Sequence, residues 1–312
     1  MTHQHPMKIA IDGASGFIGV HSAAELVRRG HSVVAMVRAE TDPRDVDVLH
    51  QIGATTAVWC ANEPDSLVDA MTGCQCLVHL IGSIAPRKGE SFAIIHQGLA
   101  AQFCAAAKAA GVDRIVMIST VGAAQDAASM YHRTKWQSEQ RLQQSGMDWV
   151  VLRSPLVVGR SVGHRDSKIV RRYLNLIAKK RRVPLVLGGK NTIQPIAVND
   201  LAHATGEVIE QPKWNGRILE VAGAETMTTR QFVERLMNAV GVRRDVKAIP
   251  GPVAWLVAVM LERFQAVPLL SRDQLRIAKT DAVCTKNALV NEFGIEPTAL
   301  DDALAVYQDC IP

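Results

Sequence analysis

The sequence MKIAIDGASGFIG, residues 7–19, decides the fold. A short apolar run, Lys8–Ile11, leads into three glycines spaced G-x-x-G-x-x-G, and an amphipathic stretch begins at Phe17. In a strand–turn–helix unit, glycines permit a tight turn, close approach of backbone N–H groups to a pyrophosphate, and close packing of helix on strand. The N-terminus of the helix then presents partial positive charge to the phosphates. The segment therefore predicts a nucleotide-binding turn.

Apolar and amphipathic runs alternate along the first half of the chain. The expected strands are Lys8–Ile11, Ser32–Val37, Thr55–Trp59, Cys76–Ile81, Arg114–Ile118 and Trp149–Leu152. The expected helices between them are Phe17–Arg29, Pro64–Met71, Ser91–Ala110 and Met130–Gln144. This alternation is typical of a parallel sheet covered by helices on both faces. The pattern therefore predicts an α/β, Rossmann-type doubly wound sheet.

After Pro155 the alternation loosens. The expected elements are a basic helix near residues 165–180, a strand at Pro184–Leu187, a strand at Ile193–Val198 that enters a helix capped by Asn199 or Asp200, and a strand at Arg217–Val221. From Thr228 onward the pattern is mostly helical. We therefore predict a dinucleotide-binding domain over residues 1–160, completed by about 195–222. A small, mainly helical C-terminal lobe would comprise residues 161–194 and 223–312.

The composition excludes several classes of protein. The 312 residues are 48% hydrophobic, which is ordinary for a globular chain. A net charge of +5 and 4% aromatic residues disfavour nucleic-acid binding. No apolar run reaches the ~18 residues of a membrane-spanning helix, and the N-terminal residues lack an apolar signal core.

The six cysteines and ten histidines do not group at metal-ligand spacing, so we predict no metal site. The cysteines are predicted to be mostly small buried thiols in a reducing cytoplasm. They are Cys60, Cys74, Cys76, Cys104, Cys284 and Cys310.

The end of the second predicted strand bears on cofactor choice. A carboxylate there accepts the ribose 2′-hydroxyl of NAD, whereas a cation suits the 2′-phosphate of NADP. The strand ends in Arg38, with no acidic residue before Glu40. We therefore expect a preference for NADP(H). The alternative is that Arg38 is a solvated charge and NAD(H) is accepted.

Tyr131 and Lys135 lie four residues apart on a predicted helix and therefore share a face. A free tyrosine has a pKa of ~10 and is a weak acid at neutral pH. A nearby ammonium would lower the pKa of Tyr131 toward the working range. Ser119 or Thr120, at the end of the preceding strand, could hold a substrate carbonyl or alcohol. The alternative is an ordinary amphipathic helix with a solvated lysine.

These motifs together resemble the short-chain dehydrogenase/reductase superfamily, and Gly-Phe-Ile-Gly resembles its extended, NAD-dependent epimerase/dehydratase-like and atypical branches. The resemblance implies Tyr131 as the general acid/base, Lys135 as its partner and nicotinamide-ribose ligand, and Thr120 as the hydroxyl residue, with Ser119 as second choice. The cofactor contacts that it implies are Gly13, Ser15, Gly16, Phe17, Ile18, Gly19, Arg38, Leu80, Ile81, Gly82, Tyr131, Lys135, Pro155, Leu156 and Val158.

The resemblance extends over nearly the whole chain. Residues 147–159 (MDWVVLRSPLVVG) look like the family's sixth strand and nicotinamide-covering loop, and residues 195–201 are PIAVNDL. The segments ETMTT (225–229), IPGP (249–252), SRDQL (271–275) and GIEPTAL (294–300) resemble bacterial relatives of the NADPH-binding accessory subunit of respiratory complex I. The implied function is hydride transfer between nicotinamide and a small carbonyl or alcohol substrate. The alternative is a non-catalytic NADPH-binding accessory or assembly subunit, or a redox sensor.

Three positions depart from the superfamily pattern. Cys60 stands where relatives often carry Asp, and the fourth strand ends Leu80-Ile81-Gly82 rather than in the commoner Ala/Gly pair. Ile95, with His96 beside it, stands where an Asn is often found. The first two changes concern cofactor contacts, and the third puts a proton relay in doubt.

Two further segments leave alternatives open. The basic stretch 165–182 has an apolar stripe, which indicates a surface helix of the lobe, a site for an anionic substrate tail, or a contact with an anionic membrane. Trp255–Phe264 is apolar nearly all round, which predicts a core helix or oligomer contact ahead of membrane contact. Peripheral attachment at the inner face of a membrane, or association with a respiratory complex, is thus an alternative to a freely cytoplasmic protein.

Overall fold

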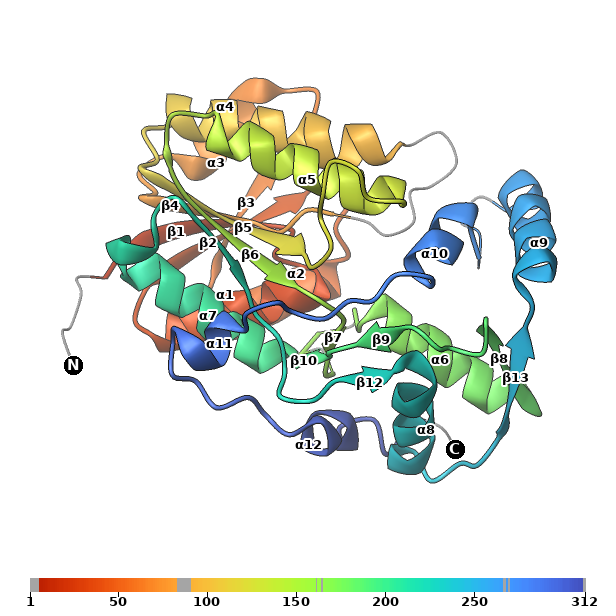
Figure 1. Cartoon of the computed structure of the whole chain (residues 1–312). Helices are drawn as coiled ribbons and strands as arrows, with labels where there is room; N and C mark the ends of the chain where they lie inside the picture. The colour runs from red at the N-terminus through yellow and green to blue at the C-terminus, as the bar shows by residue number, and fades with distance from the viewer. Residues whose placement is uncertain are drawn as a thin grey trace.

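The computed structural model describes residues 6–82, 91–160, 162–163, 165–265, 268 and 270–310. Its centre is a parallel sheet of seven strands in the order β11-β6-β5-β4-β1-β2-β3 (Figure 1). The strands are β1 (Lys8–Asp12), β2 (Ser32–Arg38), β3 (Thr55–Trp59), β4 (Cys76–His79), β5 (Arg114–Thr120), β6 (Asp148–Ser154) and β11 (Arg217–Glu220). The strand order reverses between β1 and β4, which confirms the doubly wound α/β fold.

Helices cover both faces of the sheet because its strands are apolar on both sides. On β1, Ile9 and Ile11 pack in one hydrophobic cluster, while Ala10 packs in the other. The first cluster lies under α1 (Phe17–Arg28), α2 (Pro43–Gln51) and α7 (Val198–Glu210). The second lies under α3 (Pro64–Met71), α4 (Leu99–Ala109) and α5 (Met130–Gln143).

The C-terminal part combines helices with short strand pairs (Figure 1). Its helices are α6 (Lys168–Lys179), α8 (Thr229–Ala239), α9 (Gly251–Phe264), α10 (Arg272–Ile277), α11 (Ala288–Asn291) and α12 (Leu300–Ala305). The strand pairs are β7 (Val157–Val158) with β10 (Ile196–Ala197), β8 (Arg182–Val186) with β13 (Asp245–Ile249), and β9 (Thr192–Ile193) with β12 (Met227–Thr228).

Several local predictions were wrong. Residues 43–51 form α2, a mostly polar helix that was not predicted and that buries just two of its side chains, Asp45 and Leu49. The expected helix at 91–110 begins as a π-helical turn at Ala93–Gly98 before α4. Residues 245–249, within the stretch expected to be mostly helical, form β13, which pairs with β8.

The cap predicted for α7 was also wrong, because the two side chains are used elsewhere. Ala197 precedes the helix and provides no side-chain cap. The Asn199 amide oxygen shares a hydrogen bond with His21 (2.9 Å). The Asp200 carboxylate accepts hydrogen bonds from the backbone N–H and the hydroxyl of Thr298 (2.8 and 2.7 Å).

Burial was overestimated for cysteines and for the apolar segment near residue 260. All six cysteines are free, but Cys74 and Cys76 are buried, Cys310 is exposed and the other three are half-buried. The apolar residues of α9 lie mostly on the surface, so α9 is not a core helix. Within the described residues, every helix is too short or too polar to cross a membrane.

Candidate active site

Four loops that carry predicted site residues meet at the carboxyl edge of the sheet (Figure 1). Because β1, β4, β5 and β6 are parallel and adjacent in the sheet, their C-terminal ends lie side by side. The glycine turn follows β1, Leu80 follows β4, Thr120 ends β5 and Pro155 follows β6. Ligands of open α/β sheets bind at this edge, next to the point where the strand order reverses.

The glycine turn is shaped as the sequence predicted. Gly13 has φ +61°, a backbone conformation that favours glycine. A Cβ on Gly19 would lie 2.3 Å from the carbonyl oxygen of Gly13, so a side chain there would displace α1 from β1. Gly16 precedes α1 and provides no side-chain cap. The turn therefore allows an anion to approach the N-terminus of α1.

Asp12, the last residue of β1, ties the glycine turn to the end of β4. Its carboxylate is fully buried and accepts hydrogen bonds from the N–H groups of Leu80 (2.7 Å) and Ile81 (2.9 Å). Its second oxygen is hydrogen-bonded to the imidazole of His79. Leu80 and Ile81 also lie directly against Gly13. The sequence analysis overlooked Asp12, although a carboxylate ending an apolar strand was a signal of a specific partner.

Tyr131 lies in the first turn of α5 and is packed by aromatic rings. Its ring centroid is 6.2 Å from that of Phe92, 5.6 Å from that of His96 and 5.3 Å from that of His132. Burial raises the pKa of the phenol, and the neighbouring Thr120 hydroxyl opposes this. The lowered pKa expected from the sequence is therefore wrong for this chain, because burial of the phenol dominates.

The structure separates the two candidate hydroxyl groups. The hydroxyl of Thr120 donates to the backbone carbonyl of Val121 (3.2 Å) and lies close enough to the Tyr131 phenol to lower its pKa. The hydroxyl of Ser119 donates instead to the fully buried Glu139 carboxylate (2.5 Å), which also pairs with Arg153 (2.6 Å). Thr120 therefore lies at the phenol, whereas Ser119 belongs to a buried network behind the strand.

Lys135 is buried one turn after Tyr131, and its ammonium donates to the backbone carbonyl of Ile118 (2.8 Å). Desolvation lowers the pKa of Lys135 to about 8, against the raising effect of the Glu139 and Asp12 carboxylates. The ammonium is thus anchored to β5, the strand that carries Thr120.

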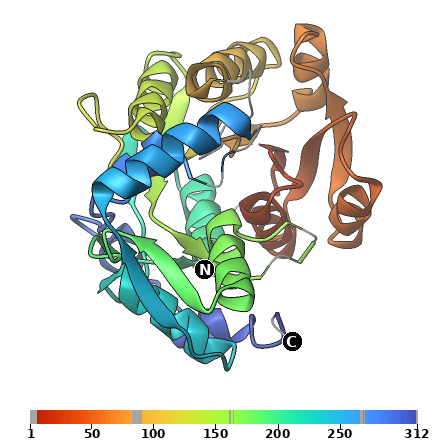
Figure 2. The same cartoon turned by 90° about the vertical axis from the view of Figure 1, so that its right-hand side faces the viewer.

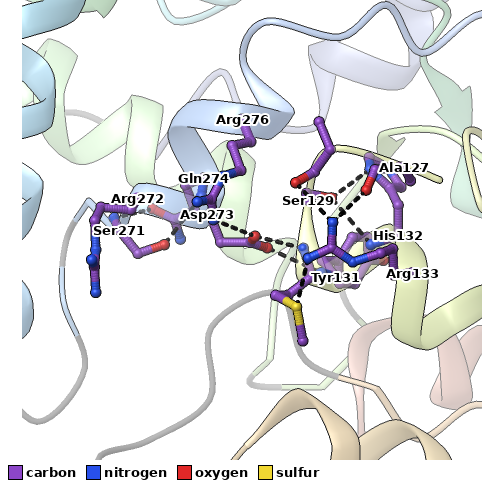
Figure 3. Close-up of polar contacts among 12 residues, drawn as sticks. Ala127, Ser129, Tyr131, His132, Arg133, Ser271, Arg272, Asp273, Gln274 and Arg276 are labelled. Atoms are coloured by element: carbon purple, nitrogen blue, oxygen red, sulfur yellow. Dashed lines mark hydrogen bonds and ion pairs between the residues drawn. The ribbon is translucent and has the colours of Figure 1, made fainter.

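The N-terminus of α5 is fixed by a residue of the C-terminal part. The Asp273 carboxylate, on α10, accepts hydrogen bonds from the N–H groups of Met130 (2.6 Å) and Tyr131 (3.0 Å) (Figure 3). The Ser129 hydroxyl accepts the next N–H, that of His132 (3.1 Å). Three of the amides that a helix N-terminus leaves unpaired are therefore satisfied. Sequence reasoning missed Asp273 because the contact joins residues 142 positions apart.

The remaining predicted cofactor residues differ in their surroundings. Arg38 is exposed and forms an ion pair with Glu40 (3.2 Å). Gly82 lies beside the His96 ring. Pro155 and Leu156 are half-buried after β6, whereas the Val158 side chain is fully buried in the core of the C-terminal part. A side chain without accessible surface offers none to a nucleotide, so a side-chain contact through Val158 is unsupported.

His96 is also held in place near Tyr131. Its Nδ1 shares a hydrogen bond with the Thr134 hydroxyl (2.8 Å), and the imidazole is almost fully buried. His79 is likewise buried and bound to Asp12. Across the part of the chain that the structure describes, no three His, Cys, Asp or Glu side chains are grouped so that they could hold a metal ion.

Comparisons with known proteins agree with this geometry. A family model described as NAD(P)H-binding matches residues 13–167, and one described as RmlD substrate binding domain matches residues 121–255. The chain is 28% identical to a 2-alkyl-3-oxoalkanoate reductase of Stenotrophomonas maltophilia, over 95% of this chain and 93% of the relative.

Two further similarities bear on function. The chain is 23% identical to subunit 9 of the NADH dehydrogenase [ubiquinone] 1 alpha subcomplex of Arabidopsis thaliana, over 89% of this chain and 71% of the relative. The fold is similar to that of an NADPH-dependent quinone oxidoreductase of Escherichia coli solved with NADPH. That similarity has a TM-score of 0.73 at 21% identity and covers 95% of this chain and 98% of the other.

Proposed function

Because this chain belongs to the NAD(P)-binding extended short-chain dehydrogenase/reductase family, we propose that it is an NADP(H)-dependent oxidoreductase acting on a small carbonyl or alcohol substrate. The observation that carries the proposal is that the Thr120 hydroxyl and the Tyr131 phenol lie beside each other at the carboxyl edge of the sheet. Lys135 lies one turn further along the same helix, anchored to the same strand.

In the proposed reaction, a substrate oxygen binds between the hydroxyl groups of Tyr131 and Thr120. NADPH, when bound, supplies the hydride that the carbonyl carbon takes up. The carbonyl oxygen takes the phenolic proton of Tyr131, so that an alcohol and NADP⁺ result. The raised pKa of Tyr131 keeps the phenol protonated and ready to donate in this direction. The Lys135 ammonium would stabilise the phenolate that remains.

The proposed preference for NADP(H) rests on Arg38. β2 pairs with β1, so the end of β2 lies beside the glycine turn. The guanidinium of Arg38 is exposed there, and its ion pair with Glu40 is solvent-exposed and therefore weak. A 2′-phosphate would compete with Glu40 for the same cation.

Turnover of NADPH tests this proposal. The purified chain would be mixed with NADPH or NADH and with a panel of 3-oxo acids and quinones, following the substrate classes of the similar reductases. We expect NADPH oxidation with at least one carbonyl class and its loss in Tyr131→Phe. Oxidation that Tyr131→Phe leaves unchanged would contradict the proposed role of the phenol.

A second candidate function is that of an NADPH-binding accessory subunit associated with a respiratory complex. The observation that favours it is the similarity to complex I subunits over most of the chain. In this role the nucleotide would stabilise the fold, and the chain would co-purify with respiratory-complex subunits from membranes. The six free thiols favour a reducing cytoplasm as the location in either case.

A further inference from the structure

Helix α9 exposes an unusual amount of apolar surface. Of the thirteen large apolar side chains exposed within the described residues, six belong to this one helix. They are Val253, Trp255, Leu256, Val257, Met260 and Phe264. Phe264 is 75% exposed and Leu256 is 58% exposed. Isolated apolar residues are normal on a surface, but a contiguous group marks an interaction site.

Five of these side chains form a single stripe. Val253, Leu256, Val257, Met260 and Phe264 follow the spacing i, i+3, i+4, i+7 and i+11, which places them on one face of the helix. The buried residues of α9 are two alanines, Ala254 and Ala258, which pack against Leu275 of α10. The helix therefore turns its small side chains inward and its large apolar side chains outward, the reverse of an ordinary surface helix.

Basic residues are concentrated in the segments that surround α9. Residues 165–190 and 243–279 together contain sixteen Lys and Arg residues and four Asp and Glu residues. The rest of the chain contains nineteen basic and twenty-six acidic residues. The modest overall charge of +5 thus conceals two strongly basic segments and an acidic remainder.

Five of these basic residues line two adjoining hollows of about 370 and 530 Å³ next to β13, which the carboxylates of Glu234 and Asp245 also line. Their cations include Arg181, Arg182, Arg243, Arg244 and Lys247. β13 runs from these hollows directly into α9, and a strand of five residues spans roughly 17 Å. Turned by 90°, the molecule presents α6, α9 and β13 together on the side that faces the viewer (Figure 2).

We propose that α9 and these hollows form a docking surface for an anionic phospholipid membrane. A helix with an outward apolar stripe lies in the plane of a membrane, and adjoining cations bind anionic headgroups. Charge complementarity selects this occupant over a second copy of the chain, because a symmetric dimer through α9 would bring two strongly basic surfaces together. The proposal does not depend on the proposed oxidoreductase activity.

Flotation of the full chain with lipid vesicles tests the proposal. One set of vesicles would contain phosphatidylcholine alone, and the other phosphatidylcholine mixed with phosphatidylglycerol. We expect the chain to float with the anionic vesicles at low salt, less at high salt, and not with the neutral vesicles. The variant Leu256→Ser/Met260→Ser should weaken binding at least about tenfold. Arg181→Gln/Arg243→Gln should weaken binding and flatten its salt dependence.

The matched control is Val58→Ser, which removes an equally exposed apolar side chain from β3, outside the proposed surface. It should float like the unaltered chain. Unchanged thermal midpoints would show that the variants fold. Absence of flotation with anionic vesicles, or flotation indifferent to Leu256→Ser/Met260→Ser, would overturn the proposal. A dimer by light scattering that this variant converts to a monomer, without vesicle binding, would assign the surface to a second copy.

Discussion

The Asp273 carboxylate lies 3.0 Å from the backbone nitrogen of Tyr131, although 142 residues separate the two in sequence. This contact makes α10 part of the support for α5, the helix that carries Tyr131. We predict that Asp273→Ala, which leaves two N–H groups unpaired, destabilises the fold by about 1–3 kcal/mol and lowers turnover. Asp273→Asn retains one acceptor oxygen, so its stability and turnover should lie between those of the unaltered chain and those of Asp273→Ala. Thermal unfolding and NADPH turnover would measure these effects.

The control for Asp273 is Asp65→Ala. Asp65 also lies in the first turn of a helix, α3, but is exposed. Asp65→Ala should change the free energy of unfolding by no more than about 0.5 kcal/mol. Equal effects of the two substitutions would contradict a specific role for the contact between α10 and α5.

Thr120 and Ser119 should respond differently to loss of their hydroxyl groups. Thr120→Val preserves the shape of the side chain and removes the hydroxyl beside the Tyr131 phenol, so turnover should fall about 10²-fold with little loss of stability. Ser119→Ala removes a donor to Glu139 and should cost about 1 kcal/mol of stability while turnover changes little. Steady-state kinetics and unfolding midpoints would separate the two. The reverse pattern would exchange the two roles.

Lys135 should lower the stability of the fold while it supports catalysis. Its pKa of about 8 in the folded chain is below its ordinary value of 10.5, so the unfolded chain binds more protons between these values. The cost of burial is therefore complete below pH 8 and disappears as the pH rises toward 10.5. Lys135→Met should stabilise the fold by about 1–2 kcal/mol at pH 7, less at pH 10, and abolish turnover.

Unfolding of the unaltered chain and of Lys135→Met at pH 7 and at pH 10 would measure the effect of Lys135. Lys108→Met, which removes an exposed lysine from α4, is the matched control and should leave the pH dependence unchanged. A variant at position 135 that is less stable than the unaltered chain at pH 7 would show that the bond to the Ile118 carbonyl outweighs the cost of burial.

Arg38→Gln should weaken the binding of NADPH more than the binding of NADH. Removing the cation takes away the partner proposed for the 2′-phosphate, so Kd for NADPH should rise about tenfold or more, while Kd for NADH stays within about twofold. Titration of NADPH and of NADH against the unaltered chain and against Arg38→Gln would measure these dissociation constants. Equal weakening of the two nucleotides would show that Arg38 does not read the 2′-phosphate.

The sequence was most informative where hydrophobic pattern and glycine spacing agree. The parallel strand Arg114–Thr120 is buried throughout and apolar at its centre, and the glycine turn has steric requirements that few other residues meet. The parallel sheet covered by helices on both faces and the glycine turn were therefore predictable. Helix α2 was not predicted, because it is short, mostly polar and buries just two of its side chains.

The site was predictable as far as it depends on short spacing. Tyr131 and Lys135 share a helix, and Thr120 ends the adjacent strand. The choice between Thr120 and Ser119 required the position of Glu139, and the role of Asp273 required the docking of α10. The exposure of α9 could not be predicted from the sequence either, because an apolar run does not show whether another element covers it.

The exchange rate of bound nucleotide tests the central claim most directly. The chain would be purified, its nucleotide identified by mass spectrometry, and the exchange with labelled NADPH timed. We predict NADP(H) that exchanges within seconds or faster, as a turnover enzyme requires. NADPH held for hours would contradict the proposed oxidoreductase and favour the accessory role, in which the nucleotide is part of the structure.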